Sequence, residues 1–402
     1  MGNVLYLVHR MPYPPDKGDK VRSYHLLKHL QRRHRVFLGT FIDDPQDEAH
    51  LPALRALCPD LHVERLSPAW GKLRSLPAML CEEPLSVRFY RSQRMRDWVA
   101  SVVRDHRPEA AVVFSGAMAQ FAMPHIAQVP MLLDLVDVDS VKWAQYAQAR
   151  RGPMAWLYQR ESRCLLAFER EAVAISEHAF LVTDKEAALF RSLAPESQHK
   201  VQALCNGVDA SVFAPEPHSP SPFASTDRPI VFTGAMDYWP NVDGVIWFAR
   251  EVLPQVRQRW PHATFHVVGR NPTPEVRALQ GPGVTVTGTV PDVRPYLQHA
   301  HAVVAPLRVA RGIQNKILEA MAMAQPVITV HGCAEAISAT PAQGLWVADS
   351  PEEWSQAIDR SLSSPQAHVQ AGLNARHFVV EHFSWQAHLS GLDALWPQGV
   401  RS

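Results

Sequence analysis

Short runs of apolar residues alternate along the chain with longer segments in which apolar residues recur at helical spacing. The first seven runs lie at residues 4–8, 36–41, 61–63, 111–114, 131–135, 180–183 and 201–204. Short apolar runs of this kind are typical of strands buried on both faces. Residues 20–30 and 154–175 instead carry apolar stripes that predict helices. The first half of the chain is therefore predicted to be an α/β domain with a parallel sheet.

The same rhythm restarts after a proline-rich stretch at residues 215–222, which can sustain neither a helix nor a central strand. Further strands are predicted at residues 230–233, 264–268, 284–287, 302–305, 326–329 and 345–347, with a helix at 242–259. We expect an N-terminal domain at 1–214, a linker at 215–229, a second α/β domain at 230–380 and a final helical segment at 381–402. Two such domains would place a ligand-binding cleft between the carboxyl ends of their sheets.

Composition agrees with two globular domains and narrows the classes of function. A chain of 402 residues is longer than a usual single-core domain. Its 40 basic and 39 acidic residues nearly cancel, so no global field attracts nucleic acid, and an anionic ligand must meet a local cluster. We therefore expect no nucleic-acid partner.

Cysteines and hydropathy bear on the compartment. The five cysteines are scattered without a C-x-x-C pair, which is typical of reduced thiols in the cytoplasm. The amino-terminal apolar run is too short for a signal peptide. The most apolar region, residues 110–135, is interrupted by Gln120, Pro124, His125 and Gln128, so any membrane contact is expected to be peripheral.

The sharpest chemical signal is a strand end and glycine loop at residues 305–312, followed by a predicted helix at 313–324. On that helix, Asn315, Lys316 and Glu319 share one face, and apolar residues occupy the opposite one. Free amides at the helix start, with Arg308, Arg311 and Lys316 nearby, are suited to a diphosphate, and Glu319 to ribose hydroxyls. The alternative is a surface helix with a basic amino end, which the helix dipole disfavours.

Two further segments follow strands of the first domain. Residues 16–22 open a helix after the first strand, and Gly18 there lets the backbone approach a ligand; the alternative is an ordinary capped turn. Asp134, Asp137 and Asp139 end the strand at 131–135, where carboxylates can supply a base or order an acceptor hydroxyl. Turn or helix-cap roles explain these aspartates equally well.

A basic and apolar stretch lies between residues 73 and 98. Its arginines are Arg74, Arg88, Arg91, Arg94 and Arg96. Contact with an anionic membrane is one interpretation, and a pair of core-covering helices with a solvated basic face is the other.

Other common sites are missing from the sequence. The 20 histidines include no H-E-x-x-H spacing, so we expect no metal site. Neither a G-x-S-x-G elbow nor a G-x-x-x-x-G-K-[ST] loop is present, which removes the commonest hydrolase and P-loop classes.

The chain resembles the family-4-type glycosyltransferases over nearly its whole length. The resemblance rests on Glu319-Ala320-Met321-Ala322 with Pro326-Val327-Ile328, on Asn206-Gly207-Val208-Asp209 with Phe213, on Phe232-Thr233-Gly234, on Val267-Val268-Gly269 and on Phe383-Ser384-Trp385. It implies the GT-B fold, in which two Rossmann-like doubly wound domains face each other across a cleft. It also implies donor binding by the second domain, acceptor binding by the first, domain closure, and a final helix that crosses back to the first domain.

Three segments resemble a narrower group, the sugar transferases associated with the exosortase (PEP-CTERM) system. They are residues 9–22, residues 134–140 and residues 311–316. This resemblance implies a bacterial enzyme of exopolysaccharide or surface-glycan synthesis, which transfers a sugar from a nucleotide donor to a glycan or lipid-linked acceptor. Retention of anomeric configuration and independence from metals or other cofactors are implied as well.

The resemblance also distributes roles over the candidate residues. The catalytic candidates are Asp137, Arg311, Lys316 and Glu319. The donor-binding candidates are Gly234, Asn241, Gly269, Arg270, Arg308, Gly312, Ile313, Gln314 and Asn315. The acceptor-binding candidates are Gly18, Arg22 and Asp139.

The sequence departs from the family in two places. The family has a glutamate eight positions before the one at Glu319, and this chain has Arg311 there, which puts the identity of the donor sugar in doubt. The turn after Gly234 lacks the family's arginine and lysine, so we expect Arg308, Arg311 and Lys316 to meet the leaving diphosphate. Asn241 has a second interpretation, as the cap of the helix that follows it.

Two rival functions remain open at this point. One is a catalytically silent protein that binds nucleotide sugars as a scaffold, which the two departures favour. The other is a nucleotide-sugar epimerase of similar fold.

Overall fold

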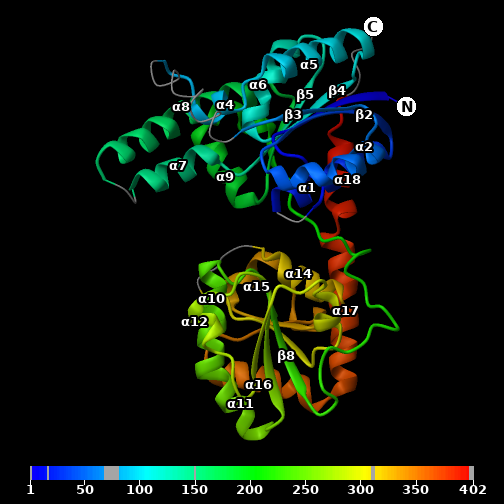
Figure 1. Cartoon of the computed structure of the whole chain (residues 1–402), viewed down its shortest axis with the longest axis vertical. Helices are drawn as coiled ribbons and strands as arrows, with labels where there is room; N and C mark the ends of the chain where they lie inside the picture. Colours follow the sequence, from blue (N-terminus) through cyan, green and yellow to red (C-terminus); the bar gives the residue numbers. More distant parts are fainter. Residues whose placement is uncertain (1, 16–17, 68–80, 149–150, 309–312, 398–402) are drawn as a thin grey trace. The chain divides into compact units, whose positions relative to one another are not determined.

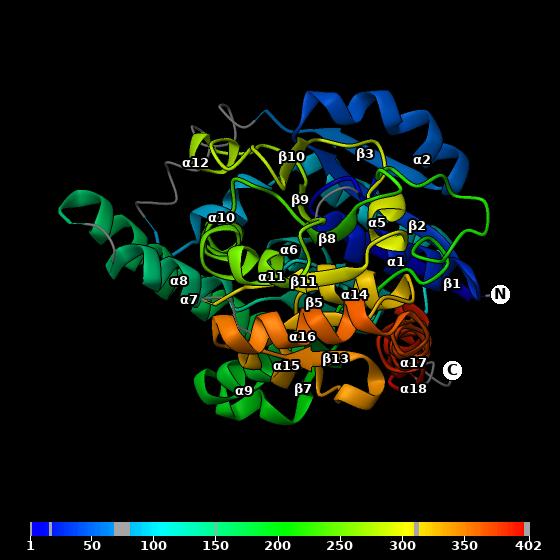
Figure 2. The same ribbon diagram turned by 90° about the horizontal axis from the view of Figure 1, so that it is seen from below.

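The computed structural model describes residues 2–15, 18–67, 81–148, 151–308 and 313–397. Its contacts divide the chain into two compact units. Residues 1–206 and 388–402 form the N-terminal unit, and residues 207–387 form the C-terminal unit. Each unit has its own parallel sheet with helices on both faces, which confirms the predicted α/β class (Figures 1 and 2).

The N-terminal unit contains a seven-stranded sheet in the order β3-β2-β1-β4-β5-β6-β7. Its strands are β1 (Gly2–Val8), β2 (His34–Ile42), β3 (Leu61–Arg65), β4 (Ala110–Phe114), β5 (Met131–Val136), β6 (His178–Leu181) and β7 (Val201–Ala203). Its helices are α1 (Gly18–Gln31), α2 (Leu51–Leu57), α4 (Leu85–Phe89), α5 (Gln93–His106), α6 (Ala119–Ala122), α7 (Asp139–Gln148), α8 (Pro153–Ile175) and α9 (Asp184–Leu193).

The C-terminal unit contains a six-stranded sheet in the order β10-β9-β8-β11-β12-β13. Its strands are β8 (Arg228–Thr233), β9 (Ala263–Val268), β10 (Val284–Gly288), β11 (Ala302–Ala305), β12 (Val327–Thr329) and β13 (Leu345–Val347). Its helices are α10 (Trp239–Trp247), α11 (Leu253–Arg259), α12 (Pro274–Arg277), α13 (Arg294–Gln298), α14 (Asn315–Ala322), α15 (His331–Ile337), α16 (Pro351–Ser363) and α17 (Pro365–Phe383).

The strands form where the apolar runs predict them because both faces of each sheet are covered by helices. All five residues of β4 are buried, and so are the last five residues of β1. Continuous apolar runs, rather than alternating ones, satisfy such doubly covered strands. The cores of the two units consist mainly of these strand residues and the helix faces that pack on them.

Two predicted helices differ from the structure for identifiable reasons. The helix expected at residues 242–259 is divided into α10, a π-helical turn (Phe248–Val252) and α11. Pro254 has no N–H to donate one turn back, which interrupts regular α-helical bonding at this point. Helix α14 is shorter than the expected 313–324, and Ala324 has a positive φ of 57° two residues before Pro326.

The segments at the two expected boundaries are engaged within the units. In the stretch expected to be a linker, Glu216 accepts a hydrogen bond at its carbonyl oxygen from the side chain of Gln298 (2.7 Å). The helical segment expected at 381–402 is broken at Ser384, where α18 (Trp385–Ala394) begins. Asp393 of α18 contacts His29 of α1 at 2.9 Å, and Trp396 stacks on His34 with ring centres 4.6 Å apart.

In each sheet the strand order reverses at one point. In the N-terminal unit the chain builds outward from β1 in one direction and from β4 in the other, and in the C-terminal unit the same holds for β8 and β11. Doubly wound folds bind ligands beyond the carboxyl ends of the strands at such points. The loops after β1, β4, β8 and β11 are therefore the places to examine for function. None of the described helices is both long and apolar enough to span a bilayer.

Candidate functional site

The turns that follow β8 and β9 are packed directly against each other. Gly234 donates its N–H to the carbonyl oxygen of Val268 (3.0 Å). A Cβ atom on Gly269 would lie only 1.7 Å from the carbonyl oxygen of Gly234. Only glycine at position 269 therefore permits this close approach of the two turns.

Lys316 reaches from the first turn of α14 to the turn at Gly234. Its ammonium group donates a hydrogen bond to Oδ1 of Asn241, whose amide nitrogen donates to the carbonyl oxygen of Ala235 (2.7 Å). A Cβ atom on Gly234 would lie 2.9 Å from Nζ of Lys316. The ammonium also lies 4.5 Å from the centre of the Phe232 ring. Asn241 thus holds a cation against the glycine turn at the carboxyl edge of the sheet.

Burial moves the pKa values of Lys316 and Glu319 toward each other. Desolvation lowers the pKa of Lys316 to about 8, although the nearby Glu319 and Cys333 raise it. Desolvation raises the pKa of Glu319 to about 7, although Lys316 lowers it. Both groups therefore change charge close to neutral pH, and an anionic ligand beside Lys316 would favour its charged form.

The amino end of α14 carries Lys316 and therefore lies close to the Gly234 turn. The side chain of Gln314, the residue before the helix, does not cap it. The buried face of the helix consists of Ile317, Leu318, Ala320, Met321 and Ala322. Asn315 is exposed, and Lys316 and Glu319 are half-buried. Packing on the sheet thus directs the start of α14, which is the positive end of the helix dipole, toward the carboxyl edge of the sheet, where the Lys316 ammonium lies.

Arg308 has a carboxylate partner that the sequence did not predict. Its guanidinium forms hydrogen bonds with both carboxylate oxygens of Asp243 (3.0 and 3.1 Å) and lies 5.3 Å from the centre of the Trp247 ring. These residues line a shallow hollow of about 360 Å³ on α10, together with the exposed Trp239. Asp243 offsets much of the charge that Arg308 was expected to offer a diphosphate.

The remaining donor candidates are placed as follows. Arg270 is exposed after β9, and Ile313 and Gln314 are half-buried just before α14. Arg311 and Gly312 lie outside the described residues. The interpretation of Asn241 as a helix cap is wrong, because α10 begins at Trp239 and its cap residue is Tyr238. Asp243 and Trp247 were not predicted, because no motif marks them and only the fold brings them to Arg308.

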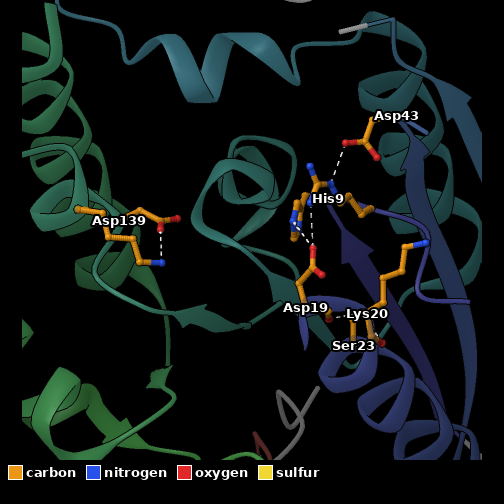
Figure 3. Close-up of polar contacts among 8 residues, drawn as sticks. His9, Asp19, Lys20, Ser23, Asp43 and Asp139 are labelled. Atoms are coloured by element: carbon orange, nitrogen blue, oxygen red, sulfur yellow. Dashed lines mark hydrogen bonds and ion pairs between the residues drawn. The ribbon is translucent and has the colours of Figure 1, made fainter. Parts of the chain in front are cut away.

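Charged and aromatic side chains meet where β1 ends in the N-terminal unit (Figure 3). Nε2 of His9 lies 3.6 Å from the Asp19 carboxylate, and Arg10 donates hydrogen bonds to Asp19 (3.2 Å) and Asp43 (2.8 Å). The His9 ring stacks on Phe114 with ring centres 5.8 Å apart. Nδ1 of His9 is buried and has no hydrogen-bond partner among the described residues.

The contact with His9 holds the pKa of Asp19 well below its usual range, although burial opposes the shift. The Asp19 carboxylate therefore stays ionised and can orient the imidazole. Sequence reasoning missed this group as a site. The sequence contains both residues in the motif at residues 9–22. That motif was noted only for its family resemblance, and nothing in it indicates that His9 contacts Asp19.

The three aspartates within and just after β5 do not form one carboxylate cluster. Asp134 is buried and pairs with Arg22, whereas Asp137 and Asp139 both accept hydrogen bonds from Lys142 (2.8 and 3.0 Å). Asp139 and its contact are drawn in Figure 3. Burial lowers the pKa of Lys142, but the two carboxylates raise it by more. Lys142 thus neutralises part of the negative charge expected at this edge.

Arg22 is buried, which contradicts its expected contact with an acceptor. Only 2% of its side chain is exposed, and it forms hydrogen bonds with both carboxylate oxygens of Asp134 (2.8 and 3.0 Å) and with the carbonyl oxygen of Leu204 (2.6 Å). Arg22 thus joins α1 to β5 and to the residue that follows β7. Gly18 is the first residue of α1, in the same motif.

The basic stretch around α4 and α5 is explained largely by packing. Arg74 lies outside the described residues, and Arg88 and Arg91 both bind Glu83. The apolar residues of α5, namely Met95, Val99, Val102 and Val103, are buried. For α5, the structure agrees with the interpretation as a core-covering helix.

The described residues contain no group of three or more His, Cys, Asp or Glu side chains suited to a metal ion. The five cysteines, all of them described, form no disulfide. The chemistry available at the C-terminal edge of the sheet is therefore that of an ammonium group, a helix start and a half-buried carboxyl group. Together these can bind a diphosphate and an adjacent pair of hydroxyls.

Comparisons with known proteins agree with this chemistry. Residues 227–364 match the family model described as Glycosyl transferases group 1. No curated protein matches the chain.

Solved structures resemble the chain over almost its full length. HepE of Anabaena, solved with UDP, has a TM-score of 0.67 and 14% identity, covering 98% of this chain and 99% of HepE. Sucrose-phosphate synthase of Thermosynechococcus elongatus has a TM-score of 0.65 and 16% identity, covering 98% of both chains. WaaG, described as a glycosyltransferase involved in lipopolysaccharide biosynthesis, has a TM-score of 0.62 and 18% identity, covering 98% of this chain and 99% of WaaG. Residues 227–364 thus resemble the glycosyltransferase group 1 domain, and the chain has the GT-B fold.

Proposed function

We propose that this chain is a retaining glycosyltransferase that moves a sugar from a nucleoside-diphosphate donor to a glycan or lipid-linked acceptor. The observation that carries the proposal is the position of Lys316, held by Asn241 against the Gly234 turn with Glu319 one helical turn away. The motif resemblance extends the proposal to bacterial exopolysaccharide or surface-glycan synthesis, in the cytoplasm and in peripheral contact with the inner membrane.

The donor binds to the C-terminal unit in this proposal. Its diphosphate lies between the Lys316 ammonium and the start of α14, and its ribose hydroxyls donate hydrogen bonds to Glu319. UDP is the first nucleotide to test, because HepE was solved with UDP and with UDP-glucose. As the bond from sugar to phosphate breaks, negative charge grows on the diphosphate, and Lys316 is already in place to stabilise it.

The acceptor binds to the N-terminal unit at the carboxyl edge of β1 and β5. Asp137 remains the proposed catalytic residue and Asp139 the proposed acceptor contact. The pair His9 and Asp19 is added to the acceptor contacts because it lies where the strand order reverses. Arg22 is withdrawn from this role because its guanidinium is buried against Asp134. No metal takes part in the proposed reaction.

Thermal stability in the presence of nucleotides tests donor binding directly. UDP at a hundred times its dissociation constant should stabilise the protein by about 2.7 kcal/mol. Glu319→Ala should remove most of this shift, because the ribose loses its acceptor. Glu335→Ala, which changes an exposed carboxylate on α15, is the matched control and should keep the shift. If E319A retained the full shift, Glu319 would not be the ribose ligand.

Transfer is tested by incubating the protein with labelled nucleotide sugars and acceptor extracts. The proposal expects release of free nucleotide that depends on the acceptor. Binding without release would instead identify a silent nucleotide-sugar-binding protein, and conversion of the sugar without release would identify an epimerase. Either outcome would overturn the transferase assignment while leaving the donor site in place.

A further inference from the structure

Helices α7 and α8 form a hairpin that extends away from the sheet of the N-terminal unit in both views (Figures 1 and 2). Near its tip, three large apolar or aromatic side chains face solvent. Tyr146 is 54% exposed, Met154 is 46% exposed and Trp156 is 59% exposed. Single exposed apolar residues are common, but three of this size on one protruding element form a patch that calls for an explanation.

Aromatic packing gives the tip a defined shape. The ring of Trp143 lies 5.8 Å from that of Tyr146 and 5.3 Å from that of Tyr158, centre to centre. Tyr146 and Tyr158 are 6.3 Å apart. These contacts join α7 to α8 and account for part of the aromatic surface. Met154 and Trp156 remain on the outside of the hairpin.

The base of the hairpin is anchored by buried polar contacts. The hydroxyl group of Ser140 in α7 donates a hydrogen bond to Glu169 of α8 (2.6 Å), and Glu161 of α8 accepts one from the backbone of Leu85 (2.7 Å). Burial raises the pKa of Glu169 to about 8, against the hydrogen bond from Ser140. The tip is therefore presented by a packed hairpin and not by an irregular loop.

Between Ser140 and Glu169, the exposed charged side chains that the structure describes are all basic, whereas the partly exposed Asp139 and the exposed Glu171 lie nearer the base of the hairpin. Between Ser140 and Glu169, the only acidic residues after Ser140 are Glu161 and Glu169 itself, of which 1% and 2% is exposed. The exposed charged residues of the described hairpin in this range are Lys142, Arg151 and Arg163. Lys142 is paired with Asp137 and Asp139 at the base, which leaves Arg151 as the described cation beside the exposed aromatic residues.

We propose that the tip of the α7–α8 hairpin, formed by Tyr146, Arg151, Met154 and Trp156, inserts into the headgroup region of an anionic lipid bilayer. Tryptophan and tyrosine prefer the interface between lipid and water, and an arginine beside them is attracted to anionic headgroups. A protein partner is the alternative occupant, and failure of the protein to bind anionic vesicles would favour it over the bilayer. The hairpin tip would make the peripheral membrane contact proposed above. Its binding to lipid would not depend on whether the protein transfers sugars.

Sedimentation with vesicles tests the proposal on the full-length protein. We expect binding to vesicles that contain phosphatidylglycerol and weak binding to vesicles of phosphatidylcholine alone, with the difference reduced at high salt. The double variant Met154→Ser with Trp156→Ser should bind the anionic vesicles about tenfold or more weakly. Arg151→Glu should also weaken binding. The matched controls are Val369→Ser with Leu373→Ser on α17, which are 58% and 52% exposed in the wild type, and Arg360→Glu on α16.

A second readout excludes misfolding as the cause. Brominated lipids quench tryptophan fluorescence only on contact, so Trp156→Phe should lose part of the quenching while it keeps its binding to vesicles. Each variant should keep the thermal shift with UDP, which separates membrane binding from donor binding. Equal vesicle binding by M154S/W156S and the wild type, or equal binding to neutral and anionic vesicles, would overturn the proposal.

Discussion

At the scale of single residues, the C-terminal site depends on two side chains whose charges are set by burial. Lys316 and Glu319 sit in the same partly desolvated place, so each is easier to neutralise than it would be in water. Their mutual attraction opposes this effect without cancelling it. A bound diphosphate would add negative charge beside Lys316 and stabilise its cationic form.

Nucleotide affinity is expected to be highest between about pH 7 and 8. Below this range Glu319 becomes protonated and accepts fewer hydrogen bonds from ribose, and above it Lys316 loses its charge. Calorimetric titration with UDP at a series of pH values measures the fall in affinity on both sides of this range. Lys316→Arg should extend binding to higher pH. Glu319→Gln should remove the part of the loss of affinity at low pH that results from protonation of Glu319. A pH profile that is the same in all three proteins would contradict this assignment.

Lys316→Ala should weaken UDP binding about 10- to 100-fold, the usual range for losing a charge-assisted hydrogen bond. Calorimetric titration with UDP measures the change in the dissociation constant.

The buried pair of Arg22 and Asp134 leads to a prediction about stability instead of binding. Arg22→Ala should destabilise the protein by about 3–5 kcal/mol, because Asp134 would remain buried without its partner. Denaturation by urea measures the change. Arg55→Ala, on the exposed face of α2, should change stability by less than about 0.5 kcal/mol. Stability like that of the wild type in R22A, with loss of acceptor use, would restore Arg22 as an acceptor contact.

At the scale of elements, the proposed donor site is made by two turns and the starts of two helices, which no single motif contains. The turn after β8 supplies Gly234, the turn after β9 supplies Gly269, and α14 supplies Lys316. Helix α10 contributes Asn241, which orients the lysine. The site therefore depends on how closely the two glycine turns approach each other.

Gly269→Ala should destabilise the protein by about 1–3 kcal/mol or more and weaken UDP binding, because its Cβ would collide with the backbone of Gly234. Gly152→Ala is the matched control. Gly152 also has a positive φ, 71°, but a Cβ there meets nothing within 4 Å, so only backbone strain of about 1–2 kcal/mol is expected. UDP binding should be unchanged in G152A. Equal effects of the two substitutions on UDP binding would argue against the packed glycine turns as part of the site.

At the scale of the whole molecule, the proposal divides the reaction between the two units and uses no metal. The cation that meets the leaving diphosphate is Lys316, assisted by the start of α14. The acceptor is left to the N-terminal unit, where His9, Asp19 and the two aspartates at 137 and 139 lie at the carboxyl edge of the sheet.

Treatment with EDTA should leave transfer activity unchanged within about twofold, since the protein supplies its own positive charge. The measurement is the rate of nucleotide release before and after chelation. Restoration of activity by Mg²⁺ or Mn²⁺ after a large loss would show that a metal neutralises the diphosphate instead.

The sequence by itself determined the class of the fold and the position of the donor helix. Apolar runs mark each of the thirteen strands in the described part of the chain because both faces of each sheet are covered, and the spacing of Lys316 and Glu319 places them on one helical face. These features are local, so periodicity reveals them. The family motifs added the likeness to a glycosyltransferase.

Which charged groups meet depends on the packing of elements that are distant in the sequence. Lys316 is bound by Asn241, 75 positions away in the chain, and Arg22 by Asp134, 112 positions away. The second pairing removed Arg22 from the proposed acceptor site, and the placement of His9 beside Asp19 added a group that sequence reasoning had missed. Such contacts depend on how strands and helices pack, and burial then sets the charge of each group. No local pattern records that information.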